Sequence, residues 1–224
     1  MAVYNAELYI YDSIYSILNQ TFYNFELIII NDFSNDRTLD IITSIDDKRV
    51  RIINNYKNIG LTKSLNLGIE YSTAEYIARM DADDLSLPKR LENQVKFMDI
   101  NPGITISGTW IKTIGSYHNE IIKYPTSHSE IYCNLLFNNP FCHPTLIMRK
   151  SNITRYNLQY TENFHYSQDY KFVFDASNKV KFANLPKVLL HYRKHSKQIA
   201  GTYRNQQIKY GNLIRTKLLN SMDI

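Results

Sequence analysis

The feature that most constrains the fold is a nearly continuous apolar run, Phe25 to Ile30, that ends at the polar pair Asn31-Asp32. Such a run is typical of a parallel strand that is covered on both faces. It belongs to a regular alternation of strands and helices joined by short links. The predicted strands are Phe25 to Ile30, Val50 to Ile53, Tyr76 to Met80 and Ile104 to Trp110; apolar stripes predict helices at Ile10 to Leu18, Leu39 to Ile45, Leu61 to Ile69 and Leu91 to Met98. The alternation predicts an α/β fold, with a mostly parallel central sheet and helices on both faces.

One predicted strand, Tyr76 to Met80, runs directly into three acids, Asp81, Asp83 and Asp84. Carboxylates this close repel one another unless a cation lies between them. Mg²⁺ and Mn²⁺ prefer oxygen ligands, often one or two carboxylates together with substrate phosphates. The pattern therefore predicts an Asp-X-Asp metal site that faces a nucleotide diphosphate. The alternative is a solvated acidic loop that precedes a helix beginning at Pro88.

Polar residues follow three of the predicted strands at the points where those strands end. They are Tyr4-Asn5, Asn31-Asp32 and the acids from Asp81 to Asp84. In open α/β sheets, ligands bind outside the carboxyl ends of the strands. We therefore expect these residues to contribute to one common site.

In the second half of the chain, strands and helices no longer alternate regularly. A loop or hairpin is predicted at 111–126, and Ser127 with Glu130 forms a capping box that begins a short helix ending at Phe137. The two prolines within Asn138 to Pro144 exclude regular structure there. Further predicted elements are a strand at Thr145 to Met148, a helix from Gln168-Asp169, a strand at Val188 to Tyr192, and a terminal helix striped by Tyr210, Leu213, Ile214 and Leu218.

Composition narrows the class of protein. The chain has 224 residues, a net charge of +5 and two cysteines, Cys133 and Cys142. Two cysteines make no disulfide framework, so we expect reduced thiols and a cytoplasmic protein. No apolar run reaches the roughly 18 residues of a membrane span, and there is no signal peptide. The modest positive charge suits an anionic substrate and predicts no nucleic-acid partner. For the basic terminal helix, contact with an anionic membrane and a solvated helix face both stay open.

Several segments carry a resemblance to a known family, in that family's order and at its spacing. They are Met1 to Glu7, Ser16 to Thr21, Phe25 to Asp36, Asn58 to Leu61, Ala78 to Asp84, Asn139 to Thr145 and Tyr192 to His195. On these motifs the sequence resembles the family-2 glycosyltransferases of the GT-A fold. The resemblance covers almost the whole chain.

The resemblance implies an inverting enzyme that moves a sugar from a nucleotide diphosphate sugar, usually a UDP-sugar, to an acceptor hydroxyl. The acceptor would be a glycan, a glycolipid or a protein, as in polysaccharide biosynthesis. Residues 1–110 would form the nucleotide-sugar-binding half and residues 111–200 the acceptor and catalytic half of one domain, followed by a C-terminal helix at 201–224.

The resemblance also implies the site residues by position. It implies nucleotide-binding roles for Val3, Tyr4, Asn5, Glu7, Asp32, Lys63 and Asp81. It implies that Asp83, Asp81 and His195 hold Mn²⁺ or Mg²⁺, with Asp83 as the direct ligand. Asp169 matches the catalytic base in the Glu-Asp pair of the family. A positioned carboxylate of this kind contributes about 10²–10⁴-fold by removing the proton of the attacking hydroxyl.

The sequence departs from the family pattern at two places. The neighbour of Asp169 is the neutral Gln168 instead of Glu, which we expect to alter acceptor handling or the pKa of Asp169. The family also has several more apolar residues before Met1, so most of its first strand is lacking here. Buried backbone groups left unpaired by that loss would cost ~1–3 kcal/mol each. We expect that the true start lies upstream or that the protein is damaged.

Other interpretations stay open at this point. A nucleotidyltransferase would favour a glycine-rich phosphate loop near the start, which the sequence lacks, and a non-catalytic or truncated remnant that binds nucleotide sugar is favoured by the short start. Single residues also have structural alternatives: Asp32 as a cap of the helix after Ser34, Asp169 as an N-cap, His143 as a loop residue and His195 as a surface residue.

Overall fold

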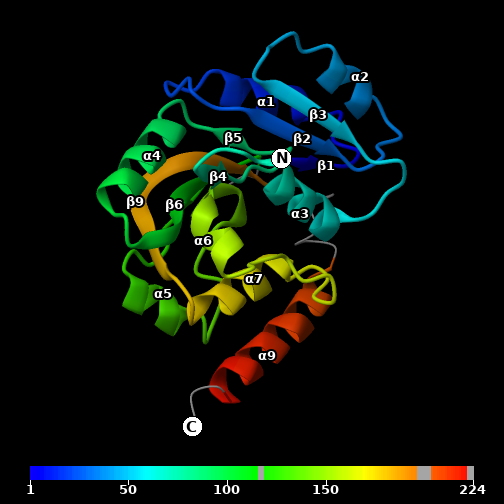
Figure 1. Cartoon of the computed structure of the whole chain (residues 1–224). Coiled ribbons are helices and arrows are strands. Elements are labelled where there is room, and N and C mark those ends of the chain that lie inside the picture. The colour runs from blue at the N-terminus through cyan, green and yellow to red at the C-terminus, as the bar shows by residue number, and fades with distance from the viewer. Residues whose placement is uncertain (116–118, 196–202, 221–224) are drawn as a thin grey trace.

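Two β-sheets form the centre of the computed structural model, which describes residues 1–115, 119–195 and 203–220 (Figure 1). The first sheet is parallel and has the order β1 (Ala2–Val3), β2 (Leu27–Asn31), β3 (Val50–Asn54). The second has the order β4 (Tyr76–Ala78), β8 (Ile147–Arg149), β6 (Ile104–Ile114), β9 (Lys181–Arg193), β5 (Leu85–Ser86), and β7 (Ile121–Ile122) pairs with β6.

Helices cover both faces of the first sheet, and this explains why every residue of β2 is buried. Side chains alternate between the faces of a strand. Ile29 packs into the cluster formed by α1 (Ile10–Leu18) and α2 (Thr38–Thr43), whereas Ile30 lies against Gly68 of α3 (Leu61–Tyr71). The prediction of a parallel strand covered on both faces is confirmed.

The second sheet is mixed, unlike the mostly parallel sheet that the alternation predicts. β6 and β9 run parallel, but β8 is antiparallel to both β4 and β6, and β5 is antiparallel to β9. Antiparallel neighbours need no crossover helix to reverse the chain, and β6 and β8 are joined through β7, the short helix α5 (His128–Asn134) and the turn η1 (His143–Thr145). The α/β class holds, with parallel pairing confined to β1–β3 and to β6–β9.

The predicted inner strand at Tyr76 to Met80 is an edge strand instead. β4 ends at Ala78 and is only partly buried, because it stands at the end of the strand order of the second sheet. Burial falls on the next two residues, Arg79 and Met80. The buried residues of this segment therefore lie after the strand, at the start of the turn that follows it.

The helices that follow β4 along the chain pack against the second sheet or, as α9 (Arg204–Asn220) does, against α7 (Gln168–Ser177). The others are α4 (Arg90–Ile100), α5 and α6 (Lys150–Arg155), and η1 is a 3₁₀ turn. The capping box of Ser127 and Glu130 is confirmed at the start of α5. Ile214 and Leu218 of α9 are buried, but Leu213 is 46% exposed, because each residue advances the helix by about 100°. The predicted segment boundary at residue 200 lies outside the described residues.

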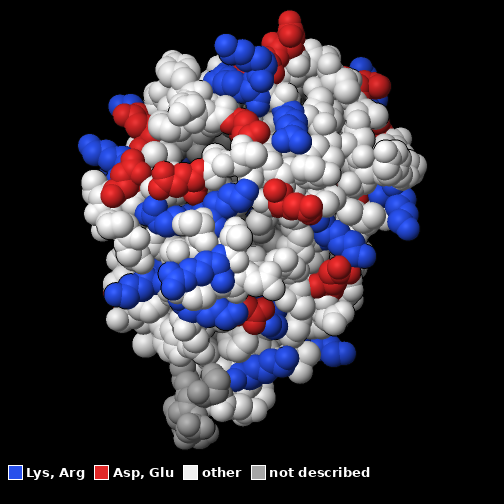
Figure 2. All heavy atoms as spheres, viewed as in Figure 1, with Lys and Arg blue, Asp and Glu red and all other residues white. Residues whose placement is uncertain are grey.

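The state of the cysteines, the hydropathy of the helices and the distribution of surface charge do not point to a particular function. Cys133 is exposed, Cys142 is buried, and both are free thiols. Among the described residues, no helix combines the length and hydropathy needed to cross a bilayer. On the face shown in Figure 2, Lys and Arg side chains are spread over the surface with Asp and Glu among them.

At Gly108 of β6 the second sheet lies very close to the segment that contains η1. A Cβ at this position would lie 2.9 Å from Cδ1 of Phe141 and 3.1 Å from Oγ1 of Thr145, and closer still to Oδ1 of Asn184. Real Cβ atoms essentially never lie closer than 3.0 Å to another heavy atom, and two of these three distances are below that limit. Glycine is therefore required for the segment 138–145 to lie against the sheet.

We expect Gly108→Ala to lower the free energy of unfolding by about 1–3 kcal/mol, because the added methyl group overpacks a filled region. Urea denaturation measures the change. Gly103→Ala is the matched control, since a Cβ there would meet nothing within 4 Å. The control should change stability by no more than about 1 kcal/mol. Equal stability of the Gly108→Ala variant and the unmodified chain would contradict the packing argument.

Candidate functional site

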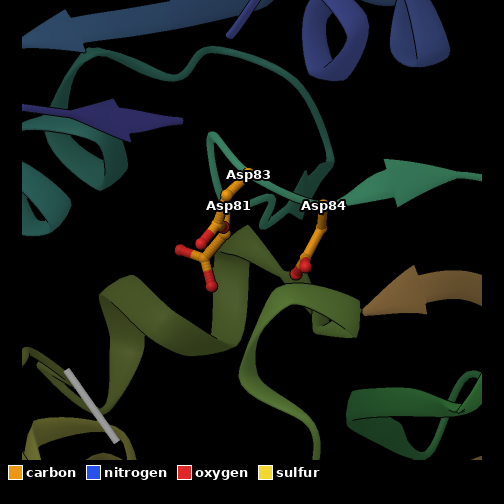
Figure 3. A group of neighbouring side chains, drawn as sticks. All are labelled: Asp81, Asp83 and Asp84. Atoms are coloured by element: carbon orange, nitrogen blue, oxygen red, sulfur yellow. The ribbon is translucent and has the colours of Figure 1, made fainter. Parts of the chain in front are cut away.

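Three aspartates lie in the turn that joins β4 to β5. These two strands form opposite edges of the second sheet, so the turn crosses from one edge to the other. Each of Asp81, Asp83 and Asp84 offers a carboxylate oxygen, and these oxygens lie within 4.8 Å of one another. Figure 3 shows the three side chains projecting from this turn to the same side. Clustered carboxylate oxygens are the donor set that Mg²⁺ and Mn²⁺ prefer.

The electrostatics of this cluster show a shortage of positive charge. Burial, followed by the charges of Asp81 and Asp83, raises the pKa of Asp84 to about 8. Burial also raises the pKa of Asp81, and the charges of Asp83 and Asp169 add to that effect. Oδ2 of Asp84 is buried without a hydrogen-bond partner among the described residues. A divalent cation would relieve both the repulsion and the unpaired oxygen, so the residues present fit a metal ion.

Arg79 binds Asp81 directly through its guanidinium. Its side chain is buried, and both of its terminal nitrogens contact the two carboxylate oxygens of Asp81. This bidentate pair lowers the pKa of Asp81 against the stronger effect of burial. Because Arg79 occupies both oxygens of Asp81, Asp83 and Asp84 have the more available oxygens.

Residues at and just after the end of β9 contact two of the three acids. Nε2 of His195 lies 2.9 Å from Oδ2 of Asp83. Arg193 donates from its backbone nitrogen to Oδ1 of Asp84 and from Nε to the carbonyl of Asp83, each at 2.8 Å. The structure therefore brings His195 to Asp83, as expected, although the two residues are 112 positions apart in sequence.

Polar side chains of α1 and of the residues just after it hold the backbone of the acidic turn and of the segment that follows it, and sequence reasoning missed them. Ser13 donates to the carbonyl oxygens of Ala82 and Asp84 at 2.8 and 2.7 Å. Gln20 donates to the carbonyl of Leu87 and accepts from the backbone nitrogen of Leu91. The available signal was a polar residue, Ser13, on the apolar face of an amphipathic helix.

Arg90 is a second residue that sequence reasoning missed. Its side chain is fully buried, and it donates to the carbonyl of Arg79, to Sδ of Met80 and to Oε1 of Gln94. Burial lowers its pKa to about 10. Gln94 in turn donates to the carbonyl of Thr145 at 2.7 Å. This pair on α4 ties the backbone before the acids to the 3₁₀ turn η1.

Two of the predicted nucleotide-binding residues near the start of the chain, Asn5 and Glu7, bind the loop between β2 and α2. Asn5 has a φ of 50°, and its Oδ1 accepts from the backbone nitrogen of Asn35 at 2.9 Å. Glu7 accepts from the backbone nitrogen of Arg37 at 3.0 Å. Val3 is buried in β1, whereas Tyr4 is 49% exposed. These residues follow the carboxyl end of β1, next to the end of β2.

Asp32 organises the loop between β3 and α3. Its buried carboxylate accepts from Nδ2 of Asn55 and from the backbone nitrogens of Ile59 and Gly60, at 2.8 to 2.9 Å. It does not cap the helix after Ser34, because the first helical nitrogen there, at Thr38, bonds to Asp36 instead. Lys63, in the first turn of α3, pairs with Glu162 at 3.2 Å.

Asp169 lies in the first turn of α7, near enough for its charge to act on Asp81. The N-cap position is Ser167, so the alternative of Asp169 as the N-cap is wrong. Burial raises the pKa of Asp169, while the backbone N–H of Tyr170, the side chain of Asn139 and the charge of Arg79 lower it. Its charge also raises the pKa of Asp81. The predicted base and the predicted metal acids therefore share one electrostatic environment.

His143 is paired with a phenol on the same side of the site. Its Nε2 lies 2.7 Å from the hydroxyl of Tyr160, and the rings meet edge to face. Burial and the nearby charge of Arg79 hold the pKa of His143 well below its usual range, so the ring is neutral at neutral pH. The interpretation of His143 as a structural loop residue agrees with this contact.

Comparison with known proteins identifies the class of chain that carries this site. An uncharacterized glycosyltransferase of Haemophilus influenzae is 37% identical over an alignment of 240 positions, which covers 100% of this chain and 74% of that protein. The O-antigen biosynthesis glycosyltransferase WbnJ of Escherichia coli is 38% identical over 208 residues, which span 88% of this chain and 79% of WbnJ.

Solved structures share the fold. Residues 1–349 of S. aureus TarS, in complex with UDP-GlcNAc, superpose with a TM-score of 0.78 at 19% identity, over 98% of this chain and 65% of that one. The mannosyltransferase PcManGT from Pyrobaculum calidifontis, in complex with GDP-Man and Mn²⁺, gives a TM-score of 0.71 at 15% identity, over 98% of this chain and 62% of that one. The predicted GT-A fold is confirmed. The model of Glycosyl transferase family 2 matches residues 1–156, and the chain belongs to this family of glycosyltransferases.

Proposed function

We propose that this protein is a metal-assisted, inverting glycosyltransferase that uses a nucleoside diphosphate sugar, with a UDP-sugar as the preferred donor. The observation that carries the proposal is the acidic turn at Asp81, Asp83 and Asp84, electrostatically coupled to Asp169 at the start of α7. The three acids of the turn suit a metal ion and a diphosphate. Asp169 offers a carboxylate that can accept a proton.

In the proposed site the metal ion, Mn²⁺ or Mg²⁺, is held by Asp83 directly, with Asp81 and His195 beside it. Asp83 suits the direct role because both oxygens of Asp81 are bound by Arg79. The metal, when bound, supplies Lewis-acid stabilisation of the diphosphate leaving group. PcManGT, a solved structural neighbour, contains Mn²⁺ together with GDP-Man, which supports the choice of metal.

The nucleotide is proposed to bind along the carboxyl ends of β1 and β2. Val3, Tyr4, Asn5, Glu7 and Asp32 lie there, and Lys63 and Asp81 complete the proposed set. Ligands of open α/β sheets bind at this edge. The complex of TarS with UDP-GlcNAc supports a UDP-sugar as donor.

Asp169 is proposed as the base. The acceptor hydroxyl transfers its proton to the Asp169 carboxylate as its oxygen forms the new bond to the anomeric carbon, and the bond from that carbon to the diphosphate breaks. A single displacement inverts the anomeric centre and leaves a nucleoside diphosphate. The N-terminus of α7 and the charge of Arg79 favour the ionised carboxylate that this role requires.

The acceptor is proposed to be a glycan or glycolipid of a surface polysaccharide, with a protein acceptor as the alternative. The relative WbnJ is named for O-antigen biosynthesis, which supports a polysaccharide. The exposed residues of α9 include Lys209 and Lys217, and contact of this helix with an anionic membrane stays part of the proposal. Membership of the family favours glycosyl transfer over nucleotidyl transfer and over a non-catalytic remnant.

The proposed base is tested by Asp169→Asn, assayed with UDP-glucose, UDP-N-acetylglucosamine and GDP-mannose in the presence of Mn²⁺. We expect release of nucleoside diphosphate to fall by at least about 10²-fold, because the general base is lost. Donor affinity, measured by calorimetry, should stay unchanged. Asp175→Asn is the matched control, since Asp175 lies on the same helix and pairs with Lys171. Equal loss of donor binding and turnover in Asp169→Asn would assign a structural role instead.

The proposed metal ligand is tested by Asp83→Asn. Removing one carboxylate from a site of few protein ligands should weaken Mn²⁺ binding by about 10–100-fold, and electron paramagnetic resonance of free Mn²⁺ measures the affinity. Asp40→Asn, an exposed acid on α2, is the control for the loss of one charge. Unchanged Mn²⁺ affinity in Asp83→Asn would remove Asp83 from the metal site.

A further inference from the structure

Asn139 is the one side chain that donates a hydrogen bond to the Asp169 carboxylate in the described part of the chain. Its Nδ2 lies 2.9 Å from Oδ2 of Asp169. Its Oδ1 accepts from the backbone nitrogen of Phe141 at 3.2 Å. A backbone N–H requires an acceptor, so the contact with Phe141 fixes which end of the amide is the oxygen. The NH₂ group therefore faces Asp169.

The segment that carries Asn139 is held on several sides. Asn184 of β9 donates to the carbonyl of Pro140 at 3.1 Å, and Phe141 packs edge-on against Phe182. Gly108 allows this close approach to the sheet. The position of Asn139 is thus set by the packing of 138–145 and does not depend on the contact with Asp169.

A second link joins the same segment to α7. His143 is hydrogen-bonded to Tyr160, and the ring of Tyr160 stacks on Phe172 with centroids 4.4 Å apart. Phe172 lies three residues after Asp169, hence on nearly the same side of α7. Asn66 of α3 binds both the backbone nitrogen and the carbonyl of Tyr160 at 2.9 Å. The segment and the first turns of α7 are therefore tied at two points.

We propose that Asn139 is a positioning residue for glycosyl transfer, which orients the Asp169 carboxylate and stabilises its negative charge through a donor fixed by the 138–145 segment. The inference rests on the proposed role of Asp169 as the base. It assigns a function to the Asn139-Pro140-Phe141 turn.

The groups around Asp169 explain why such a donor matters. Burial disfavours the charged carboxylate, and the like charge of Asp81 acts in the same direction. Arg79 and the first-turn N–H groups of α7 oppose them. The phenols of Tyr124 and Tyr160, which also face this charge, are neutral because their pKa values are raised. The Asn139 amide is the side-chain hydrogen-bond donor among the groups that stabilise the charged form, beside the backbone N–H of Tyr170 and the charge of Arg79.

The pH dependence follows from the sign of this contact. A base must be deprotonated to act, so activity rises with pH through the pKa of Asp169. Loss of the Asn139 donor raises that pKa, because hydrogen bonds to the charged form favour it. The acidic limb of the pH–rate profile then moves to higher pH, and activity falls most below that limb.

The experiment measures the Asp169 titration directly, without substrate, by ¹³C NMR of protein labelled at the Asp carboxyl carbons, with the resonance assigned by its loss in Asp169→Asn. We expect Asn139→Ala to raise the midpoint by about half to one pH unit. Asn139→Asp should raise it by more than about one unit, since it retains an acceptor for Phe141 but places a second carboxyl group against Asp169. The pH–rate profile of donor turnover should shift in parallel.

Asn134→Asp is the matched control, because it makes the same chemical change at an exposed residue of α5, five positions earlier. It should leave the midpoint unchanged. An unchanged midpoint in both Asn139 variants, with turnover lowered equally at every pH, would show a purely structural role and overturn the inference. If turnover instead survives in Asp169→Asn, the proposed function of Asp169 fails, whatever the Asn139 variants show.

Discussion

The bidentate contact between Arg79 and Asp81 is the interaction on which the rest of the site depends. It places one buried positive charge at the base of a turn that carries three carboxylates. That charge is too little for the cluster, since burial and like charges still raise the pKa values of Asp81 and Asp84. The site therefore carries an excess of acid that a cation would stabilise. A buried charge of this kind is retained for what it organises, because burying it costs free energy.

The turn is held by elements that come from every part of the fold. Ser13 of α1 binds its carbonyl groups, Arg90 of α4 binds the backbone just before it, and Arg193 of β9 binds its end. These contacts come from a helix near the start of the chain, a helix in its middle and a strand near its end. The carboxylates are thus placed before any ligand arrives, which is the condition for electrostatic stabilisation at low reorganisation cost.

The sequence predicted the elements better than their pairing. The apolar run of β2 and the apolar stripe of α1 are local patterns, and the three acids after β4 fall within four positions, so all could be found without long-range information. The mixed pairing of the second sheet could not be predicted in this way, because the direction of each strand depends on the path of the chain between strands that are distant in sequence. Asn139 and Arg90 were also missed, since their partners lie 30 and 11 residues away and nothing in the local pattern indicates a buried contact. The roles of Asp32 and Lys63 toward the nucleotide stay predictions.

The division of labour at this site follows from where its charges lie. Asp84 is buried beside the like charges of Asp81 and Asp83, whereas Asp169 has a helix N-terminus, an amide and the field of Arg79 to support its ionised form. Like carboxylates in such different surroundings take different tasks, one group suited to a cation and the other to a proton. Arg79 connects the two, because it binds Asp81 and also lowers the pKa of Asp169. A change at Arg79 therefore reaches both functions, while a change at Asn139 reaches the base alone.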